Sequence, residues 1–476
     1  MFDGRYTMST LFPRPLTRHH LLIVLLPLLD YLQNVMVMFG AGAILAGSHG
    51  TLDNFGQLVA ACAVVSCAMI AAHRWCVQRL GYRRFLQVSL LLLALGALLC
   101  SRADAFAGVL LGRLLQAAGG AALFTAARVQ IQHYQGPARG QTILLLPLGI
   151  MLGAGSAPLL AAASLHWLGW RALFWLPLPL LGLTLWLTRS MPAHEPVADA
   201  QRSHGAASGL LWLLPGVALW LFALEQVRQV PLAAGGLSWL LGLAGCGLLL
   251  GHVRQQWRRQ RGLLPYARFA SGHYLWGMAA YGCGYVLAAG MAYLLPLYLL
   301  HGLQLDLLDS GLLLGGSTLL AIPGVVLHFV LMRRWPKPVR YVQLAMLALV
   351  LACALLATAS RQDLGWLLLA CTLCHAVFMP FLLGTAAGTT FARVDEQVFS
   401  QAYQAKNMLR ELAGALGVSW AGLGLQALAG QPAARLPALP QVLQQAVPLL
   451  LAGVALAALV CGGLLVWQRR RLEALA

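Results

Sequence analysis

LLIVLLPLLDYLQNVMVMFGAGAIL, residues 21–45, is long and apolar enough to cross a bilayer as one helix. A membrane-spanning helix needs about 20 mostly apolar residues. Other stretches of this kind follow along the rest of the chain. The sequence therefore predicts an all-α membrane protein with fourteen transmembrane helices, at residues 20–46, 54–72, 84–101, 106–130, 141–164, 171–188, 208–227, 233–252, 273–299, 310–332, 341–359, 364–390, 407–428 and 446–467.

The composition supports this interpretation. Hydrophobic residues make up 60% of the chain and charged residues 10%, and the mean hydropathy is +0.74. Soluble domains contain about 25% charged residues, so the composition excludes a water-soluble protein. Backbone groups in lipid must bond within their own segment, which a long span does as a helix. The strand alternation of a membrane β-barrel, over about 10 residues, does not occur in this sequence.

The basic residues fall on alternate sides of the predicted spans. Of the 32 lysines and arginines, 26 lie on one side, 5 lie on the other and Arg113 lies within a span. Cytoplasmic loops carry the excess of Lys and Arg, so both termini are expected in the cytoplasm and the protein in the inner membrane. The net charge of +18 is then a topology signal with some attraction to anionic lipid, and no nucleic-acid partner is expected.

Two polar stretches divide the chain. Residues 189–207 and 253–272 bracket the spans at 208–227 and 233–252. We therefore expect a six-helix bundle in residues 1–190, a linker with two additional spans in 191–270, and a second six-helix bundle in 271–476. The chain lacks the G-x-x-x-x-G-K-[ST] phosphate loop of nucleotide-driven pumps. A gradient across the membrane is the expected energy source.

The first span carries a polar stripe. Gln33 and Asn34 follow Asp30 at i+3 and i+4, which places the three side chains on one helix face. Ionisable groups in a span cost about 2.5–3.5 kcal/mol and tend to be functional. We expect Asp30 to be a protonatable site beside a substrate path that Gln33 and Asn34 also line. A structural hydrogen-bond anchor between helices is the alternative.

Arg113 is a second ionisable residue within a span, and Gln116 shares its helix face. A buried arginine stays charged and needs a partner, for which Asp30 is the first candidate. The pair would act either as a conformational switch or as a static salt bridge. Glu225, near the outer end of its span, is a candidate for the cavity or an interfacial neighbour of Arg228. Arg410 and Glu411 are expected near a cytoplasmic helix end, as a gate or an anchor.

Histidines and cysteines give little evidence of a cofactor or metal site. Cys371, Cys374 and His375 match the haem-attachment pattern C-x-x-C-H, but they lie in the middle of a span, where covalent haem has no room. His328 and His375 are expected to be core residues. No spacing of metal ligands is found, so neither a cofactor nor a metal is predicted.

Several motifs occur in a characteristic order. The chain resembles the major facilitator superfamily, in particular its fourteen-helix drug:proton antiporter branch. LLDYLQNVMV is similar to the first-helix signature, with Asp30 at the acidic position. RWCVQRLGYRRF resembles the loop between helices two and three, with Arg79, Gly81 and Arg83 in place. RLLQAAGG is similar to the fourth-helix motif.

Two further motifs belong to the same resemblance. GAGSAPLLAA resembles the fifth-helix antiporter motif, with Pro158 matching and alanines at 157, 161 and 162 where glycines are usual. KNMLRELAGALG fits the C-terminal half, with Arg410 and Gly414 matching. These residues are expected to serve conformational change. The usual aspartate of the second-to-third-helix loop is replaced by Gln78, which departs from the family's charge relay.

The resemblance implies a major facilitator fold with a 6+2+6 layout and alternating access around a central cavity. It implies a proton-coupled exporter of hydrophobic or cationic small molecules, with a periplasmic adaptor protein as a partner in some relatives. A specific metabolite or siderophore transporter, in either direction, is the main alternative. A sensor and an intramembrane enzyme are less favoured, because no signalling domain and no intramembrane nucleophile or metal motif is found.

Overall fold

The structure, a computed structural model, describes residues 18–50, 52–131, 136–191, 206–229, 236–259, 262–429 and 439–474. All regular structure in these ranges is helical, which confirms the predicted fold class. The N-terminal part contains α2 (Arg18–Phe39), α3 (Ala41–Gly47), α4 (Leu52–Leu80), α5 (Tyr82–Arg102), α6 (Phe106–Ile131), α7 (Gly136–Trp167), α8 (Ala172–Trp175) and α9 (Leu178–Leu187).

Two long helices follow, α10 (Ala206–Gln229) and α11 (Gly236–Arg258). The C-terminal part contains α12 (Gly272–Leu297), α13 (Leu307–Leu319), α14 (Ala321–Arg334), α15 (Pro338–Thr358), α16 (Leu364–Thr372), α17 (Met379–Thr390), α18 (Glu396–Ala429) and α19 (Leu439–Ala474). Short π-helical turns, Tyr298–Gly302 and Leu373–Phe378, continue α12 and join α16 to α17.

Thirteen helical segments among the described residues are long and apolar enough to cross a membrane. The predicted span at 407–428 lies in α18, which has 34 residues but carries Lys406, Arg410 and Glu411 along its length. These charges lower its mean hydropathy, and α18 is not among the thirteen. With α18 counted by its length and position, the helices agree with the fourteen predicted spans.

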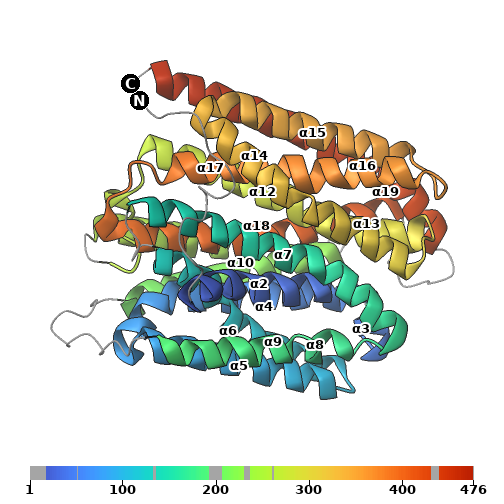
Figure 1. The fold of residues 1–476 in the computed structure, drawn as a ribbon, viewed down its shortest axis with the longest axis horizontal. Coiled ribbons are helices and arrows are strands. Elements are labelled where there is room, and N and C mark those ends of the chain that lie inside the picture. The colour runs from blue at the N-terminus through green and yellow to red at the C-terminus, as the bar shows by residue number, and fades with distance from the viewer. Residues whose placement is uncertain are drawn as a thin grey trace.

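The N-terminal and C-terminal parts lie side by side. In Figure 1, α2–α9 fill the lower half of the view and α12–α19 most of the upper half, with α7 and α18 near the boundary. Contacts between the parts run along α7 with α13 and along α4 with α18. The helices α10 and α11 pack on each other, and α10 also contacts α4 and α18. The inserted pair therefore covers one of the two seams.

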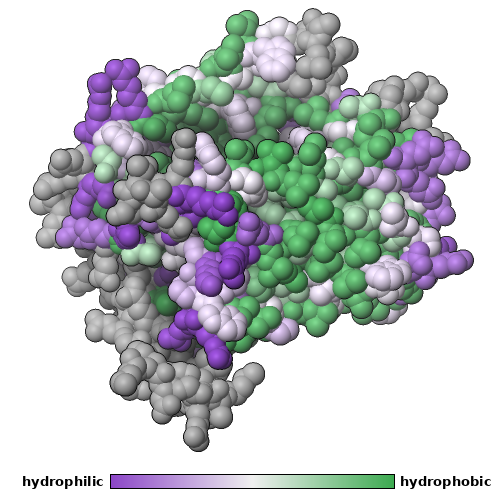
Figure 2. Space-filling view, turned by 90° about the horizontal axis from the view of Figure 1, so that it is seen from above, coloured by the Kyte–Doolittle hydropathy of each residue, from purple (hydrophilic) through white to green (hydrophobic). Residues whose placement is uncertain are grey.

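The outer surface is apolar over the middle of the bundle. Figure 2 shows a broad hydrophobic face with hydrophilic groups gathered toward its two ends. On α11 the side chains of Leu237, Leu240, Leu243 and Leu250 are 65–70% exposed. A helix with this exposure in a soluble protein would aggregate, whereas in a bilayer these side chains face lipid tails.

Small residues bring the helices close at the seam between α7 and α13. A Cβ atom added at Gly311 of α13 would lie 2.5 Å from the Ala162 Cβ and 2.9 Å from the Pro158 carbonyl oxygen. A Cβ added at Gly315 would lie 2.7 Å from the Gly155 carbonyl oxygen. Close backbone approach of this kind is how helices associate in lipid.

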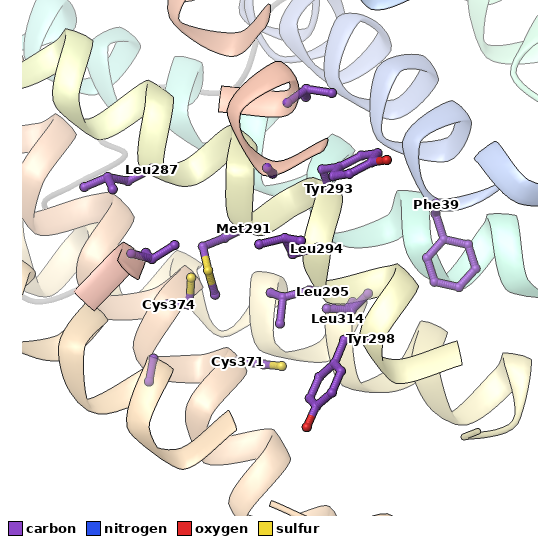
Figure 3. Packing of buried hydrophobic residues seen from close by; sticks show 14 of the residues in the cluster. Phe39, Leu287, Met291, Tyr293, Leu294, Leu295, Tyr298, Leu314, Cys371 and Cys374 are labelled. Atoms are coloured by element: carbon purple, nitrogen blue, oxygen red, sulfur yellow. The ribbon is translucent and has the colours of Figure 1, made fainter. Parts of the chain in front are cut away.

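The C-terminal core contains the cysteines of the haem-like pattern. Cys371 and Cys374 are buried and lie beside Met291 and Leu295 of α12, as Figure 3 shows. His375 instead bonds Ser317 at 2.9 Å between Nδ1 and Oγ. Both thiols are therefore packing groups in a hydrophobic cluster that also includes Phe39 of α2.

Candidate functional site

Asp30 lies past the middle of α2, with its carboxylate almost fully buried. Asn34, one helical turn later, donates from Nδ2 to Asp30 Oδ1 at 3.1 Å and to the Asp30 carbonyl oxygen at 2.9 Å. The i, i+4 spacing of the sequence thus produces a direct bond between the two side chains. A buried carboxylate needs such partners, because an ionised group without them is very costly in a low-dielectric environment.

The ion-pair partner of Asp30 is Arg410 of α18. Arg410 Nη2 lies 3.3 Å from Asp30 Oδ2, and both side chains are largely buried. The same guanidinium donates from Nη2 to Glu411 Oε1 at 2.7 Å and from Nε at 3.0 Å. The expectation that Arg113 pairs with Asp30 is therefore corrected: an arginine from the other half of the molecule holds that position.

Arg113 joins the same group of residues indirectly. Its Nη2 donates to Asn34 Oδ1 at 2.8 Å and its Nη1 to Gln116 Oε1 at 2.9 Å. Asn34 therefore links Arg113 to Asp30. We refer to Asp30, Asn34, Arg113, Arg410 and Glu411 as the core ion network. It connects α2, α6 and α18, so a change of charge at Asp30 acts on contacts within one half and between the halves.

The position of Arg410 also corrects a second expectation, that this residue lies near a cytoplasmic helix end. The helix α18 begins at Glu396, so Lys406 and Arg410 lie several turns inside it. Without these two residues, 24 basic residues remain on the cytoplasmic side and 5 on the other, so the charge bias remains. The spacing of Lys406 and Arg410, four residues apart, could have indicated one continuous helix. A hydropathy average instead treats charged residues as the end of a span.

Lys406 is buried at 2% exposure and is surrounded by aromatic rings. Its Nζ lies 4.7 Å from the ring centroids of Phe124 and Tyr403, 5.1 Å from that of Tyr281 and 5.8 Å from that of Tyr285. These four rings, which we call the aromatic cage, come from α6, α12 and α18. Cations within about 6 Å of a ring are attracted by its quadrupole. The rings of Tyr281 and Tyr285 also stack on each other.

Gln33 of α2 and Gln116 of α6 share their surroundings in the N-terminal half. Both line a small cavity within the N-terminal half, together with Leu29, Leu93, Ala97, Leu173, Phe174, Pro177, Leu178 and Leu181. Gly120 of α6 allows the close approach, since a Cβ there would lie 2.7 Å from Gln33 Nε2 and 3.5 Å from Asp30 Oδ1. The two glutamines therefore share one cavity, although the sequence placed Gln33 on the stripe of the first span and Gln116 on the helix face of Arg113.

Glu225 is not part of this group. It is buried on α10, where Ser419 Oγ of α18 donates to its Oε1 at 2.7 Å. Ser419 is nine residues beyond Arg410, or about 13 Å along the helix. The side chain of Arg228, its expected neighbour, lies outside the described residues. Glu225 therefore sits between the inserted pair and the C-terminal half.

The loop motif between α4 and α5 has a glycine for a geometric reason. Gly81 has φ 74°, a left-handed conformation that only glycine adopts at low cost, and it forms the N-cap of α5. Arg79 stacks on Trp75 at 4.3 Å, and Arg83 Nη1 donates to the Met191 carbonyl oxygen at 3.4 Å. Both arginines make local contacts at one end of the bundle, away from the core ion network.

The remaining motif residues lie on the helices that join the halves. Pro158 is buried on α7 at the close contact with Gly311. Gly414 of α18 has no atom within 4 Å of an added Cβ, whereas a Cβ at Gly417 would lie 2.3 Å from the Val286 carbonyl oxygen. On the same helix, Asn407 Nδ2 donates to Thr125 Oγ1 of α6 at 2.7 Å. This is a buried bond between the halves.

The chain is similar to known sequences over most of its length. The family model of the Major Facilitator Superfamily matches residues 23–418. A protein named as a multidrug resistance protein, MdtD of Cronobacter sakazakii, is 27% identical over 374 residues, which is 75% of each chain. The protein of the same name from Pectobacterium atrosepticum is 25% identical over 375 residues, again 75% of each chain. A multidrug resistance protein B homolog of Mycobacterium tuberculosis is 27% identical over 194 residues, 40% of this chain and 35% of that one.

Solved structures match over nearly the whole chain. The POT family transporter PepTSo gives a TM-score of 0.66 at 14% identity, covering 97% of this chain and 99% of that one. The nucleoside transporter NupG gives 0.59 at 12% identity, covering 94% and 99%. At these identities the likeness concerns the fold, and it confirms the major facilitator fold expected from the sequence.

Proposed function

This chain belongs to the Major Facilitator Superfamily, and from that premise we propose that it is a proton-coupled secondary transporter that exports small molecules by alternating access. Membership makes it a multi-pass membrane transporter rather than an enzyme. Proton coupling, export as the direction of transport and alternating access are what we propose beyond membership. It places the protein in the inner membrane with both termini in the cytoplasm, in keeping with the distribution of its basic residues.

The ion pair of Asp30 with Arg410 carries the proposal. It joins the two halves at the centre of the bundle, and one of its members is protonatable. Protonation of Asp30 removes the charge that attracts Arg410, while Glu411 remains as an alternative partner for the guanidinium at 2.7 Å. The pair is then a contact between halves that depends on a proton. Such a contact couples proton binding to the rocking of residues 1–190 against residues 271–476, with residues 191–270 as the inserted pair.

The relatives' names support export of drug-like molecules. The resemblance favoured hydrophobic or cationic substrates. The core holds Lys406 and Arg410 besides Arg113, so these basic residues leave the charge of the substrate open. A carrier of one metabolite or siderophore is the second candidate, favoured by the density of buried polar side chains around Asp30. A periplasmic adaptor as partner belongs to the proposal by resemblance only.

Proton movement in everted membrane vesicles tests the proposal. Vesicles with the wild-type protein and with Asp30→Asn, at matched expression, would be given lipophilic cations, neutral compounds and amphiphilic acids, with a pH-quenched dye as the readout. The expected result is substrate-dependent proton movement that is lost in Asp30→Asn. Asp104→Asn is the matched control, because Asp104 pairs with Arg171 at a side-chain exposure of 92%. Equal proton movement in wild type and Asp30→Asn would refute coupling through Asp30.

A further inference from the structure

The core contains more positive than negative charge. Arg113, Lys406 and Arg410 are three buried or nearly buried cations, and Asp30 and Glu411 are the carboxylates beside them. Both carboxylates contact Arg410. Among the residues that the structure describes, neither Arg113 nor Lys406 has a carboxylate within ion-pair distance. Buried charges are normally paired, so this excess calls for a counter-charge.

Lys406 and Arg410 are two like charges that lie close together. Lys406 and Arg410 are four residues apart on α18, and like charges at this spacing destabilise a helix. Both cations also lie over the same ring, since Phe124 is 4.7 Å from Lys406 Nζ and 4.8 Å from the Arg410 guanidinium carbon. An anion between the two cations would convert this repulsion into attraction.

Two donors of the core ion network are unused. Arg113 Nε and Arg410 Nη1 are buried and have no hydrogen-bond partner in the described part of the chain. A buried donor without a partner costs about 1–3 kcal/mol, more when it is charged. The Lys406 ammonium, which carries three donors, lies over ring faces that attract a cation. The site thus offers hydrogen-bond donors of positive charge beside aromatic surface.

We propose that the substrate of this transporter is an amphiphilic organic anion, with a carboxylate that binds between Lys406 and Arg410 and an apolar or aromatic body that packs on the aromatic cage. This deepens the proposed function and rests on it in taking the surroundings of Asp30 as the substrate path. Carboxylate binds arginine and lysine by charge-assisted hydrogen bonds. Four aromatic rings supply the apolar contact area that the body of such a molecule needs.

The proposal fixes how Asp30 and the substrate influence each other. The Asp30 carboxylate and the substrate carboxylate compete for Arg410, so neutralising Asp30 favours the anion. By linkage, a bound anion in turn favours the protonated form of Asp30.

Three probes with one aromatic body and different charges test the proposal: 2-naphthoate, 2-naphthylmethanol and 2-naphthylmethyl-trimethylammonium. Their binding to the purified full-length protein in lipid nanodiscs would be measured by equilibrium dialysis. We expect 2-naphthoate to bind at least about tenfold more tightly than the other two. Lys406→Gln should lower the affinity for 2-naphthoate at least about tenfold, and Lys406→Arg should retain most of that affinity. Tighter binding of the ammonium probe would overturn the proposal.

Two more variants keep the test decisive if Lys406→Gln does not fold. Asp30→Asn should raise the affinity for 2-naphthoate and leave the affinity for 2-naphthylmethanol unchanged. Weaker 2-naphthoate binding in this variant would contradict the proposal. Arg128→Gln is the matched control, because Arg128 also lies on the Tyr403 ring, at 5.7 Å, without contacting the core ion network. An equal loss in Arg128→Gln and Lys406→Gln would mean a diffuse charge effect and no anion site at Lys406.

The binding test and the vesicle test fail independently. Tight 2-naphthoate binding without proton movement for any compound would refute the proton coupling and leave the anion site standing. Proton movement that depends on Asp30, together with tighter binding of the ammonium probe, would refute the anionic substrate but not the proton coupling through Asp30.

Discussion

Arg410 Nη2 lies 3.3 Å from Asp30 Oδ2, although the two residues are 380 positions apart in the chain. The contact joins the first membrane-spanning helix to α18 and is buried on both sides. It is also branched, because Arg410 contacts Glu411 and Asp30 contacts Asn34. A proton on Asp30 would therefore redistribute bonds that already exist, without exposing the arginine to lipid.

Removing one member of this pair should cost more than removing both. Arg410→Met leaves the carboxylates of Asp30 and Glu411 without their cation, and breaking a buried pair in this way costs about 3–5 kcal/mol. The double variant Asp30→Asn with Arg410→Met removes one of these two unpaired charges and should recover part of the thermal stability. Tryptophan fluorescence during heating in detergent would measure both. Additive losses in the double variant would show that the two side chains do not interact.

Asn34 should matter for transport more than its size suggests, because it bonds both Asp30 and Arg113. Asn34→Leu leaves two charged groups without this partner, at a cost of about 1–3 kcal/mol. We expect transport in vesicles to fall at least about tenfold at equal expression. Asn54→Leu is the control, since the Asn54 bond to Gln57 lies at the surface. Similar transport in the two variants would rule out a role of the link through Asn34.

The sequence predicts the spans and the polar stripe of α2 well, because both follow from local properties. Mean hydropathy over about 20 residues identifies a span, and the i, i+4 spacing places Asn34 beside Asp30. The position of Arg113 within a span is equally local. These features need no knowledge of how the helices pack.

The pairing of Asp30 is not a local property. Arg113 and Arg410 are both basic residues on long helices, and their neighbours in the sequence do not indicate which one faces Asp30. That choice depends on how the two halves meet. Hydropathy also hides Lys406 and Arg410, because charges inside a span lower the mean and shift its apparent start. Glu225 shows the same difficulty, since Ser419, its partner, is 194 positions away.

Two glycines of α13 allow a matched test of the seam between the halves. A Cβ at Gly311 would lie 2.5 Å from the Ala162 Cβ, whereas a Cβ at Gly316 has no atom within 4 Å. Both changes to alanine raise helix propensity by about 1 kcal/mol. Gly316→Ala should be neutral or stabilising, and Gly311→Ala should cost about 1–3 kcal/mol through overpacking. Thermal unfolding measures both, and equal midpoints would show that α7 and α13 are not in close contact.

Glu225 should act as a structural acceptor between α10 and α18. Ser419 Oγ donates to Glu225 Oε1 at 2.7 Å, and the amide of Glu225→Gln offers the same acceptor without a titratable group. We therefore expect Glu225→Gln to keep its thermal stability and its proton movement in vesicles. Glu225→Leu removes the acceptor and should lose about 1–3 kcal/mol, since the buried Ser419 hydroxyl loses this partner. If Glu225→Gln remains stable but loses proton movement, Glu225 binds a transported proton and the inserted helices take part in coupling.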